Sequence, residues 1–108
     1  MLVVDDMAFS GCSGLKRVVF PESLMIIGNR TFQGCAALEE ISLPENLKCI
    51  GPWAFSACRK LKEVTIPACV EDVGRQAFSR CTSLRKFTVS AENKRYKAVD
   101  GKLVKMIL

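Results

Sequence analysis

Residues 38–60 read LEEISLPENLKCIGPWAFSACRK, and this stretch decides the fold because its pattern recurs through most of the chain. The same residue types return every 23 positions on both sides of it. Phenylalanine, for example, occupies Phe9, Phe32, Phe55 and Phe78. A constant period of this length is typical of a solenoid, in which each coil covers the apolar face of the next. The sequence therefore predicts about four stacked coils.

Other residue columns keep the same register. They are Cys12, Cys35, Cys58 and Cys81; Leu15, Leu38, Leu61 and Leu84; Val18, Ile41, Val64 and Phe87; Phe20, Leu43, Ile66 and Val89; Pro21, Pro44 and Pro67; and Gly28, Gly51 and Gly74. Within one coil, inward Val18 alternates with outward Arg17 and Val19, and this period of two predicts a strand. The proline that follows ends the strand because it has no N–H to continue a ladder.

The remaining parts of each coil are predicted from the position of glycine and from the three-residue spacing of Phe, Cys and Leu. A second extended segment, residues 24–27 in the first coil, ends at Gly28, where we expect a positive φ at a corner. Phe9, Cys12 and Leu15 stand three apart, which predicts a short helical or 3₁₀ turn. Each coil thus reads as strand, corner, extended segment, corner and helical turn.

These motifs resemble the BspA-like (Treponema-type) leucine-rich repeat family. The resemblance rests on Leu38, Ile41, Leu43 and Pro44, then Ile50 and Gly51, then Ala54, Phe55 and Cys58, and it covers residues 2–104. It implies an α/β-type repeat solenoid, a right-handed superhelix with a parallel sheet on one face. The pattern weakens at the ends, where Asp5 and Lys97 occupy the glycine column and Ser90 the proline column.

The repeat also predicts how the chain is divided. Residues 1–90 form the coils, and residues 91–108 form a divergent C-terminal segment. Within that segment Asp100 and Gly101 stand between apolar stretches, which is typical of a tight hairpin turn. The ends of the chain do not look like polar caps, because residues 1–4 and Val104, Met106, Ile107 and Leu108 are apolar. We therefore expect a fragment of a longer array, or association of chains end to end as a dimer or larger assembly.

Composition argues against an enzyme. The chain has no histidine, which removes Ser/His and Cys/His nucleophile pairs and imidazole metal ligands. The acids that recur, such as Glu39 and Glu63, fall on outward columns, where they are solvated and unsuited to general acid–base chemistry. The sequence therefore predicts neither a catalytic residue, nor a cofactor, nor a metal site.

The six cysteines allow two interpretations. Disulfides are one, but four of the residues share a column with parallel Cβ directions, a poor geometry for a disulfide. A stack of buried, reduced thiols that pack as small hydrophobic groups is favoured. Cys49 and Cys69 fall outside that column and are expected at the surface, as incidental thiols or as reactive switches.

The outward side chains of the predicted strands are the candidate binding residues. On a solenoid, such side chains form an extended surface whose chemistry is free to vary, and its mixed charges suit protein recognition. The predicted binding residues are Lys16, Arg17, Val19, Glu39, Glu40, Ser42, Lys62, Glu63, Thr65, Arg85, Lys86 and Thr88. An ordinary solvated sheet face is the alternative.

Three functions remain open. The resemblance implies surface proteins that bind host or matrix components and other cells, so a protein or cell-surface ligand and a role in adhesion come first. A structural spacer or self-associating segment comes second. A third is an anion or nucleic-acid binder, because the net charge of +5 comes from the C-terminal end, at Lys94, Arg95, Lys97, Lys102 and Lys105. Nucleic acid is disfavoured because only Tyr96 is available for stacking.

The resemblance to this family also implies where the protein is located. It implies a protein that is secreted or held at the cell surface. The first residues lack the basic and apolar regions of a signal peptide, so a cytoplasmic location stays an alternative. Apolar runs are only a few residues long, so no membrane insertion is expected.

Overall fold

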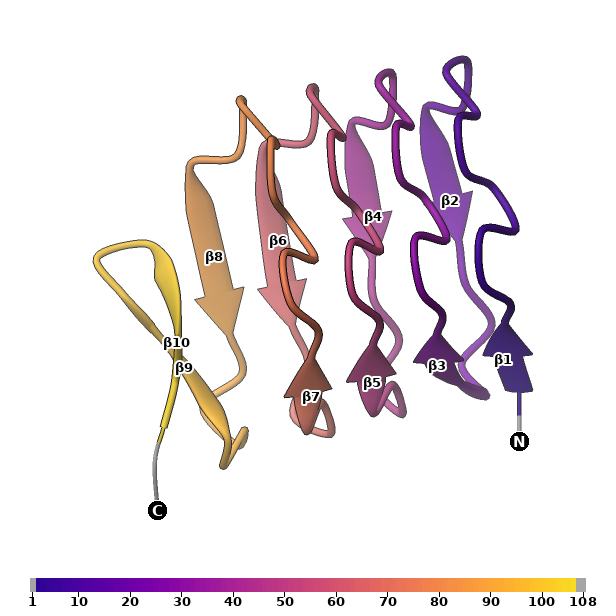
Figure 1. Cartoon of the computed structure of the whole chain (residues 1–108). Coiled ribbons are helices and arrows are strands. Elements are labelled where there is room, and N and C mark those ends of the chain that lie inside the picture. Colours follow the sequence, from indigo (N-terminus) through magenta and orange to yellow (C-terminus); the bar gives the residue numbers. More distant parts are fainter. Residues whose placement is uncertain (1, 107–108) are drawn as a thin grey trace.

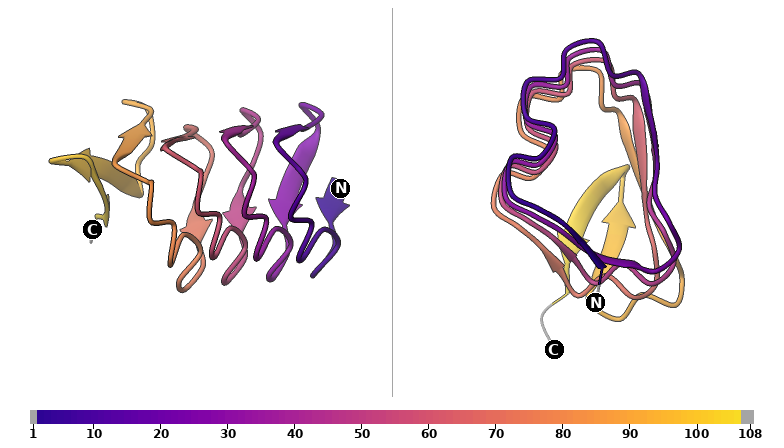
Figure 2. Two further views of the ribbon diagram at one scale, coloured as in Figure 1. Left: turned by 90° about the horizontal axis from the view of Figure 1, so that it is seen from above. Right: turned by 90° about the vertical axis from the view of Figure 1, so that its right-hand side faces the viewer.

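The computed structural model describes residues 2–106 and consists of coils stacked side by side along one axis (Figure 1). Its extents are 38 × 33 × 21 Å. The chain begins at one end of the stack and finishes at the other (Figure 1). Viewed along the axis, successive coils follow nearly the same closed outline (Figure 2).

Strands run along two walls of the stack. One wall holds β1 (Leu2–Val4), β3 (Leu24–Ile27), β5 (Cys49–Ile50) and β7 (Asp72–Val73) in one parallel sheet. The other wall holds β2 (Arg17–Val19), β4 (Glu40–Ser42), β6 (Glu63–Ile66) and β8 (Lys86–Val89). A final antiparallel hairpin joins β9 (Tyr96–Val99) to β10 (Lys102–Lys105).

Strand register follows the 23-residue repeat. Val18 pairs with Ile41 across β2 and β4, Val64 with Phe87 across β6 and β8, and Ile27 with Ile50 across β3 and β5. Because these partners share a column of the sequence, the prediction of coils stacked at this period is confirmed.

The phenylalanine column forms the centre of the core. Phe9, Phe32, Phe55 and Phe78 stack with ring centroids 5.2–5.4 Å apart and rings within 6° of parallel. Phe32 and Phe55 are fully buried. Phe20 and Phe87 meet the stack edge-on, at 5.8 and 5.3 Å. Such aromatic contacts add to the free energy gained by burying the rings.

No helix occurs within residues 2–106, so the α/β expectation was wrong. The Phe–Cys–Leu segment is instead a string of turns. In the second coil, Cys35 N–H closes a turn on the Phe32 carbonyl, whereas Phe32 N–H donates to Ala54 in the next coil at 2.7 Å. Arg30 and Gly34 have φ of 55° and 76°. Left-handed residues at this spacing interrupt any helix, and alternate N–H groups turn outward to join the coils.

The glycine column is required for a reason other than the one expected. Gly28, Gly51 and Gly74 do not have a positive φ. A Cβ added at Gly51 would lie 2.6 Å from the carbonyl carbon and oxygen of Gly28. Glycine therefore stands here because the backbones of successive coils approach closely, and the corners are turned by other residues.

The wall of β2, β4, β6 and β8 is not one continuous sheet. β2 pairs with β4 and β6 pairs with β8, but β4 and β6 lie side by side without a ladder between them. Across the paired strands Arg17 faces Glu40, and Glu63 faces Lys86. By the same repeat Glu40 neighbours Glu63, and like charges on adjacent strands are unfavourable. We call this boundary between β4 and β6 the seam.

Buried thiols follow the phenylalanine stack. Cys35, Cys58 and Cys81 are buried and free, and their Sγ atoms donate to the carbonyls of Phe9, Phe32 and Phe55 at 3.1–3.4 Å. Burial raises the pKa of the Cys35 thiol. The prediction of reduced, stacked thiols is confirmed for these three residues, and none of the six cysteines forms a disulfide.

Cys12 differs from the rest of its column because it belongs to the end coil. Its thiol is exposed, as are the side chains of Leu2, Val3 and Phe9, at 40–43% for these three. The N-terminal end of the described chain therefore presents an uncovered apolar coil. Met1, Ile107 and Leu108, which contributed to the expectation of apolar ends, lie outside the described residues.

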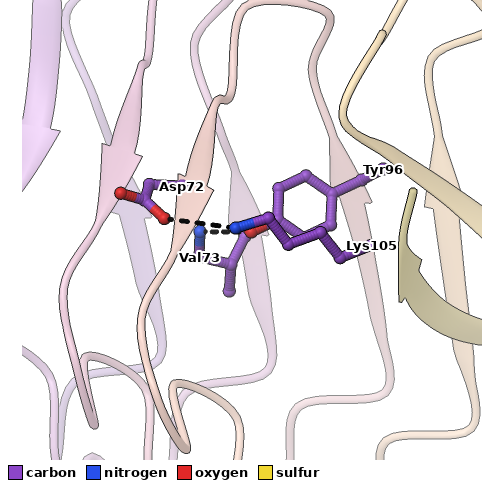
Figure 3. Close-up of polar contacts among 4 residues, drawn as sticks. All are labelled: Asp72, Val73, Tyr96 and Lys105. Carbon is purple, nitrogen blue, oxygen red and sulfur yellow. Dashed lines mark hydrogen bonds and ion pairs between the residues drawn. The ribbon is translucent and has the colours of Figure 1, made fainter. Parts of the chain in front are cut away.

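The hairpin of β9 and β10 lies against the other end of the stack and covers part of it, and we call this the covered end (Figures 1 and 2). The Tyr96 hydroxyl accepts a 2.8 Å hydrogen bond from Val73 N–H at the outer edge of β7 (Figure 3). Asn93 is buried, donates to the carbonyls of Pro67 and Val70, and accepts from the N–H groups of Arg95 and Tyr96. The side chains of Tyr96 and Asn93 thus make hydrogen bonds to the last coil that the backbone of a further coil would otherwise make.

Candidate functional site

The outer face of β2, β4, β6 and β8, with the residues just before each strand, is the candidate site, and we call it the sheet face. The alternation of inward and outward residues places its side chains; in β6, Val64 and Ile66 are buried and Glu63 and Thr65 exposed. All twelve predicted binding residues are exposed, and they form three parallel rows across the four coils. Val19 is 92% exposed, the most exposed large hydrophobic side chain of the described chain.

Charges on the sheet face form bands. The first coil contributes Lys16 and Arg17, the second Glu39 and Glu40, the third Lys62 and Glu63, and the fourth Arg85 and Lys86. No ion pair joins any of these eight side chains, all of which lie in the described part of the chain. Their charges therefore remain available to a binding partner.

An open groove of about 380 Å³ lies at the seam. Its lining is Glu39, Glu40, Ile41, Lys62, Glu63 and Thr65. Five of these six belong to the predicted binding residues, so the structure brings those five together around one hollow. Ile41 was assigned to the core by its column, but it is only half-buried and forms part of the groove.

A second groove, of about 320 Å³, lies beside the fourth strand of the wall. It is lined by Lys62, Glu63, Ser83, Arg85 and Lys86. Lys62 and Glu63 also line the seam groove, so the two grooves are adjacent and lie on either side of these residues. The remaining predicted residues lie outside both grooves: Lys16, Arg17, Val19, Ser42 and Thr88.

The basic C-terminal end is less coherent as a site. Lys94, Arg95, Lys97, Lys102 and Lys105 are all exposed along β9, β10 and the residues before them. The Lys105 ammonium lies 4.0 Å from the Asp72 carboxylate (Figure 3). Lys94 and Arg95 share a groove with Lys48 and with Glu71 and Glu92, whose negative charges offset two of the three positive ones. Acidic neighbours therefore reduce the positive field that an anion would meet.

Of the two cysteines expected at the surface, Cys49 differs from that expectation. Cys69 is exposed as predicted, whereas Cys49 is half-buried, and desolvation together with the nearby Asp72 and Glu71 raises the pKa of its thiol. A raised pKa lowers the thiolate fraction and argues against a reactive switch there. Trp53 is half-buried beneath the Arg30 guanidinium, which lies 5.0 Å from its ring centroid. This cation–π contact holds Trp53 to the corner of the second coil.

Neither a membrane-spanning helix nor a cluster of metal ligands occurs within residues 2–106. Among these residues there is no helix with the length and apolar character needed to cross a bilayer. Over the same range, no group of three or more Cys, Asp or Glu side chains is placed to hold a metal ion.

Comparison with solved structures gives close matches to bacterial repeat proteins. A leucine rich cell surface protein from Faecalibacterium prausnitzii is 32% identical, with a TM-score of 0.87 over 94% of this chain and 26% of its own. The pneumococcal vaccine antigen PcpA is 29% identical, with a TM-score of 0.90 over 97% and 26%. The T. pallidum leucine rich repeat protein is 31% identical, with a TM-score of 0.62 over 80% and 51%. No curated protein matches the sequence.

The chain spans about a quarter of the length of the first two of these structures. The model of the BspA type leucine rich repeat region matches residues 2–98 in six copies. Most of the described chain thus carries the repeat, and the resemblance seen in its columns is confirmed. The chain belongs to the BspA-type leucine-rich repeat family.

Proposed function

We propose that the chain is a non-catalytic recognition module that binds a protein ligand on its sheet face, as part of a protein displayed at the cell surface. The observation that carries this proposal is the set of twelve exposed side chains, of which eight are charged and form no ion pairs with one another. Leucine-rich repeat proteins generally mediate protein interactions. Similar structures include a cell surface protein and a pneumococcal antigen, which supports the proposed location.

A displayed library of random ten-residue peptides tests the proposal while the ligand is unidentified. Peptides selected on the wild-type chain are then measured against a variant that carries Arg17→Glu and Lys86→Glu on the sheet face. We expect most to lose affinity at least tenfold, because the charge that the first and fourth coils present on the sheet face falls from +2 to zero in each. The matched control is Lys48→Glu, an exposed residue just before β5 on the opposite wall. Selected peptides that bind the sheet-face variant as tightly as the wild type would overturn the proposal.

Self-association is the second candidate, and the uncovered N-terminal coil favours it. Within the stack, the Thr31, Ala54 and Ala77 carbonyls each accept an N–H from the preceding coil. The equivalent carbonyl of Ala8 has no such donor within residues 2–106, and the Phe9 ring beside it is 43% exposed. A second copy of the chain would cover this apolar end.

Light scattering over a concentration series tests this second candidate. We expect the wild-type chain to exceed the monomer mass at micromolar concentration and Phe9→Asp to remain monomeric. Val19→Asp is the control, since it removes a more exposed apolar side chain of the same coil that lies on the sheet face and not on the open end. A wild-type chain that stays monomeric throughout would refute self-association and leave ligand binding as the function.

A further inference from the structure

One row of the sheet face has an ordered sequence of charges. Arg17, Glu40, Glu63 and Lys86 occupy the same position in successive coils and are exposed. Along the stack the row therefore reads positive, negative, negative, positive. Strands in a sheet lie about 4.8 Å apart, so the row is about 14 Å long.

The two negative charges of this row share one hollow. Glu40 and Glu63 both line the seam groove, together with the half-buried Ile41 and the hydroxyl-bearing Thr65. No ladder closes the seam between β4 and β6. Glu39 and Lys62 also line this groove, so a cationic side chain that enters it would meet three carboxylates and one ammonium, a net charge of −2. Its alkyl stem would lie along Ile41.

Strand geometry fixes which partner matches this row. In an extended segment, alternate side chains point the same way and are about 6.8 Å apart. Three such side chains span about 13.6 Å, close to the length of the row. Acidic side chains at the first and fifth positions would reach Arg17 and Lys86. A basic side chain at the third position would lie over the seam, halfway between them.

Resting on the proposed protein-recognition function, we propose that the sheet face binds an extended peptide segment of the pattern acidic–x–basic–x–acidic. The segment runs along the stack, across the strands, with its basic side chain in the seam groove between Glu40 and Glu63. A second copy of the sheet face does not fit, since full antiparallel overlap would place Lys16 and Arg17 against the basic pair of the fourth coil.

Titration of the ¹⁵N-labelled chain with synthetic peptides tests the pattern. The probe is Glu-Ser-Lys-Ser-Glu flanked by glycine and serine, and the comparison peptide is its charge inverse, Lys-Ser-Glu-Ser-Lys. We expect amide shifts at β4, β6 and the ends of the row with the probe, and at least about fivefold weaker binding of the inverse. Binding should weaken with salt, because the paired charges are exposed.

Substitution of the two carboxylates tests whether the basic side chain of the peptide binds in the seam groove. The variant with Glu40→Gln and Glu63→Gln removes both carboxylates at nearly constant shape and should bind the probe at least about fivefold more weakly. The control Lys48→Gln should leave binding unchanged, and a dispersed amide spectrum confirms that each variant folds. Retained affinity in the double glutamine variant, or equal binding of the inverse peptide, would overturn the pattern.

The two proposals fail in different ways. If library-selected peptides still depend on Arg17 and Lys86 while the acidic–x–basic–x–acidic probe does not bind, the sheet face is a recognition surface and the peptide pattern is wrong. If the selected peptides bind independently of both residues, the recognition surface itself is wrong.

Discussion

Substitution of Gly51 by alanine tests how the coils fit together. The added methyl would lie 2.6 Å from the carbonyl carbon and oxygen of Gly28, whereas carbon atoms normally approach to about 3.5–4.0 Å. Relief of this overlap requires the two coils to separate locally by about 1 Å. The hydrogen bond from Gly51 N–H to the Ile27 carbonyl, now 2.8 Å, would then be lost.

The expected cost combines these two effects. Overpacking of a tight interior costs about 1–3 kcal/mol. Loss of one backbone hydrogen bond adds about 0.5–1.5 kcal/mol. We therefore expect Gly51→Ala to lower the free energy of unfolding by about 2–4 kcal/mol, a large share of the about 5–15 kcal/mol typical of a domain.

Urea unfolding followed by circular dichroism measures this change. Gly14→Ala is the control, because Gly14 has no atom within 4 Å of an added Cβ and no positive φ. It should leave stability unchanged or raise it by up to about 1 kcal/mol, through the unfolded chain. The reasoning is refuted if Gly51→Ala unfolds at the same urea concentration as the wild type, or if both variants lose stability equally.

Three further predictions concern the covered end and the thiols. Tyr96→Phe should cost about 1–3 kcal/mol in urea unfolding, because the Val73 N–H loses its acceptor while the ring stays in place. Asn93→Ala should cost more than Tyr96→Phe in the same assay, since four hydrogen bonds are lost. The free energy of unfolding should fall as the pH rises above about 9, because burial raises the pKa of the Cys35 thiol, and the Cys81 thiol together with burial raises that of Cys58, so the unfolded chain ionises first. The same contact lowers the pKa of Cys81, which offsets part of the contribution of Cys58.

Each of these predictions has a matched control. For the covered end, Val99→Ala at an exposed position of β9 shows the cost of a substitution in the hairpin that removes no side-chain hydrogen bond. A loss of stability in Tyr96→Phe no larger than in Val99→Ala would contradict the role of the hydroxyl. For the pH dependence, the double variant Cys35→Ala and Cys58→Ala should show a shallower fall between pH 8 and pH 10. An unchanged slope in that variant would mean that other groups cause the fall.

The sequence was sufficient to predict the stack, because the same columns that repeat in it pair in space. Phe32 over Phe55 and Val18 beside Ile41 follow directly from their equal spacing. The turn segment was predicted wrongly because three-residue spacing describes both a 3₁₀ helix and a string of turns. Positive φ at residues such as Arg30 and Trp53 decides between them, and ordinary side chains give no signal of that conformation.

The candidate site could be predicted only in part. Alternation along the strands was enough to place eight of the twelve side chains on one face, because outward residues of a strand do not depend on distant contacts. The other four, Lys16, Glu39, Lys62 and Arg85, directly precede the strands and follow from the 23-residue repeat. The seam could not be predicted, since it depends on whether neighbouring strands form a ladder. Its only signal in the sequence is that Glu40 and Glu63 are both acidic, whereas Arg17 and Glu40 differ in sign.

Contacts between aromatic rings in solution test the central claim most directly. In a nuclear Overhauser spectrum of the labelled chain, the Phe55 ring should show contacts to both Phe32 and Phe78, each 23 residues away. Amide protons of the turns should likewise lie near the following coil, as Phe32 N–H lies near Ala54. Phenylalanine rings in separate surroundings, with contacts only three or four residues along the chain, would contradict the stacked coils and every surface derived from them.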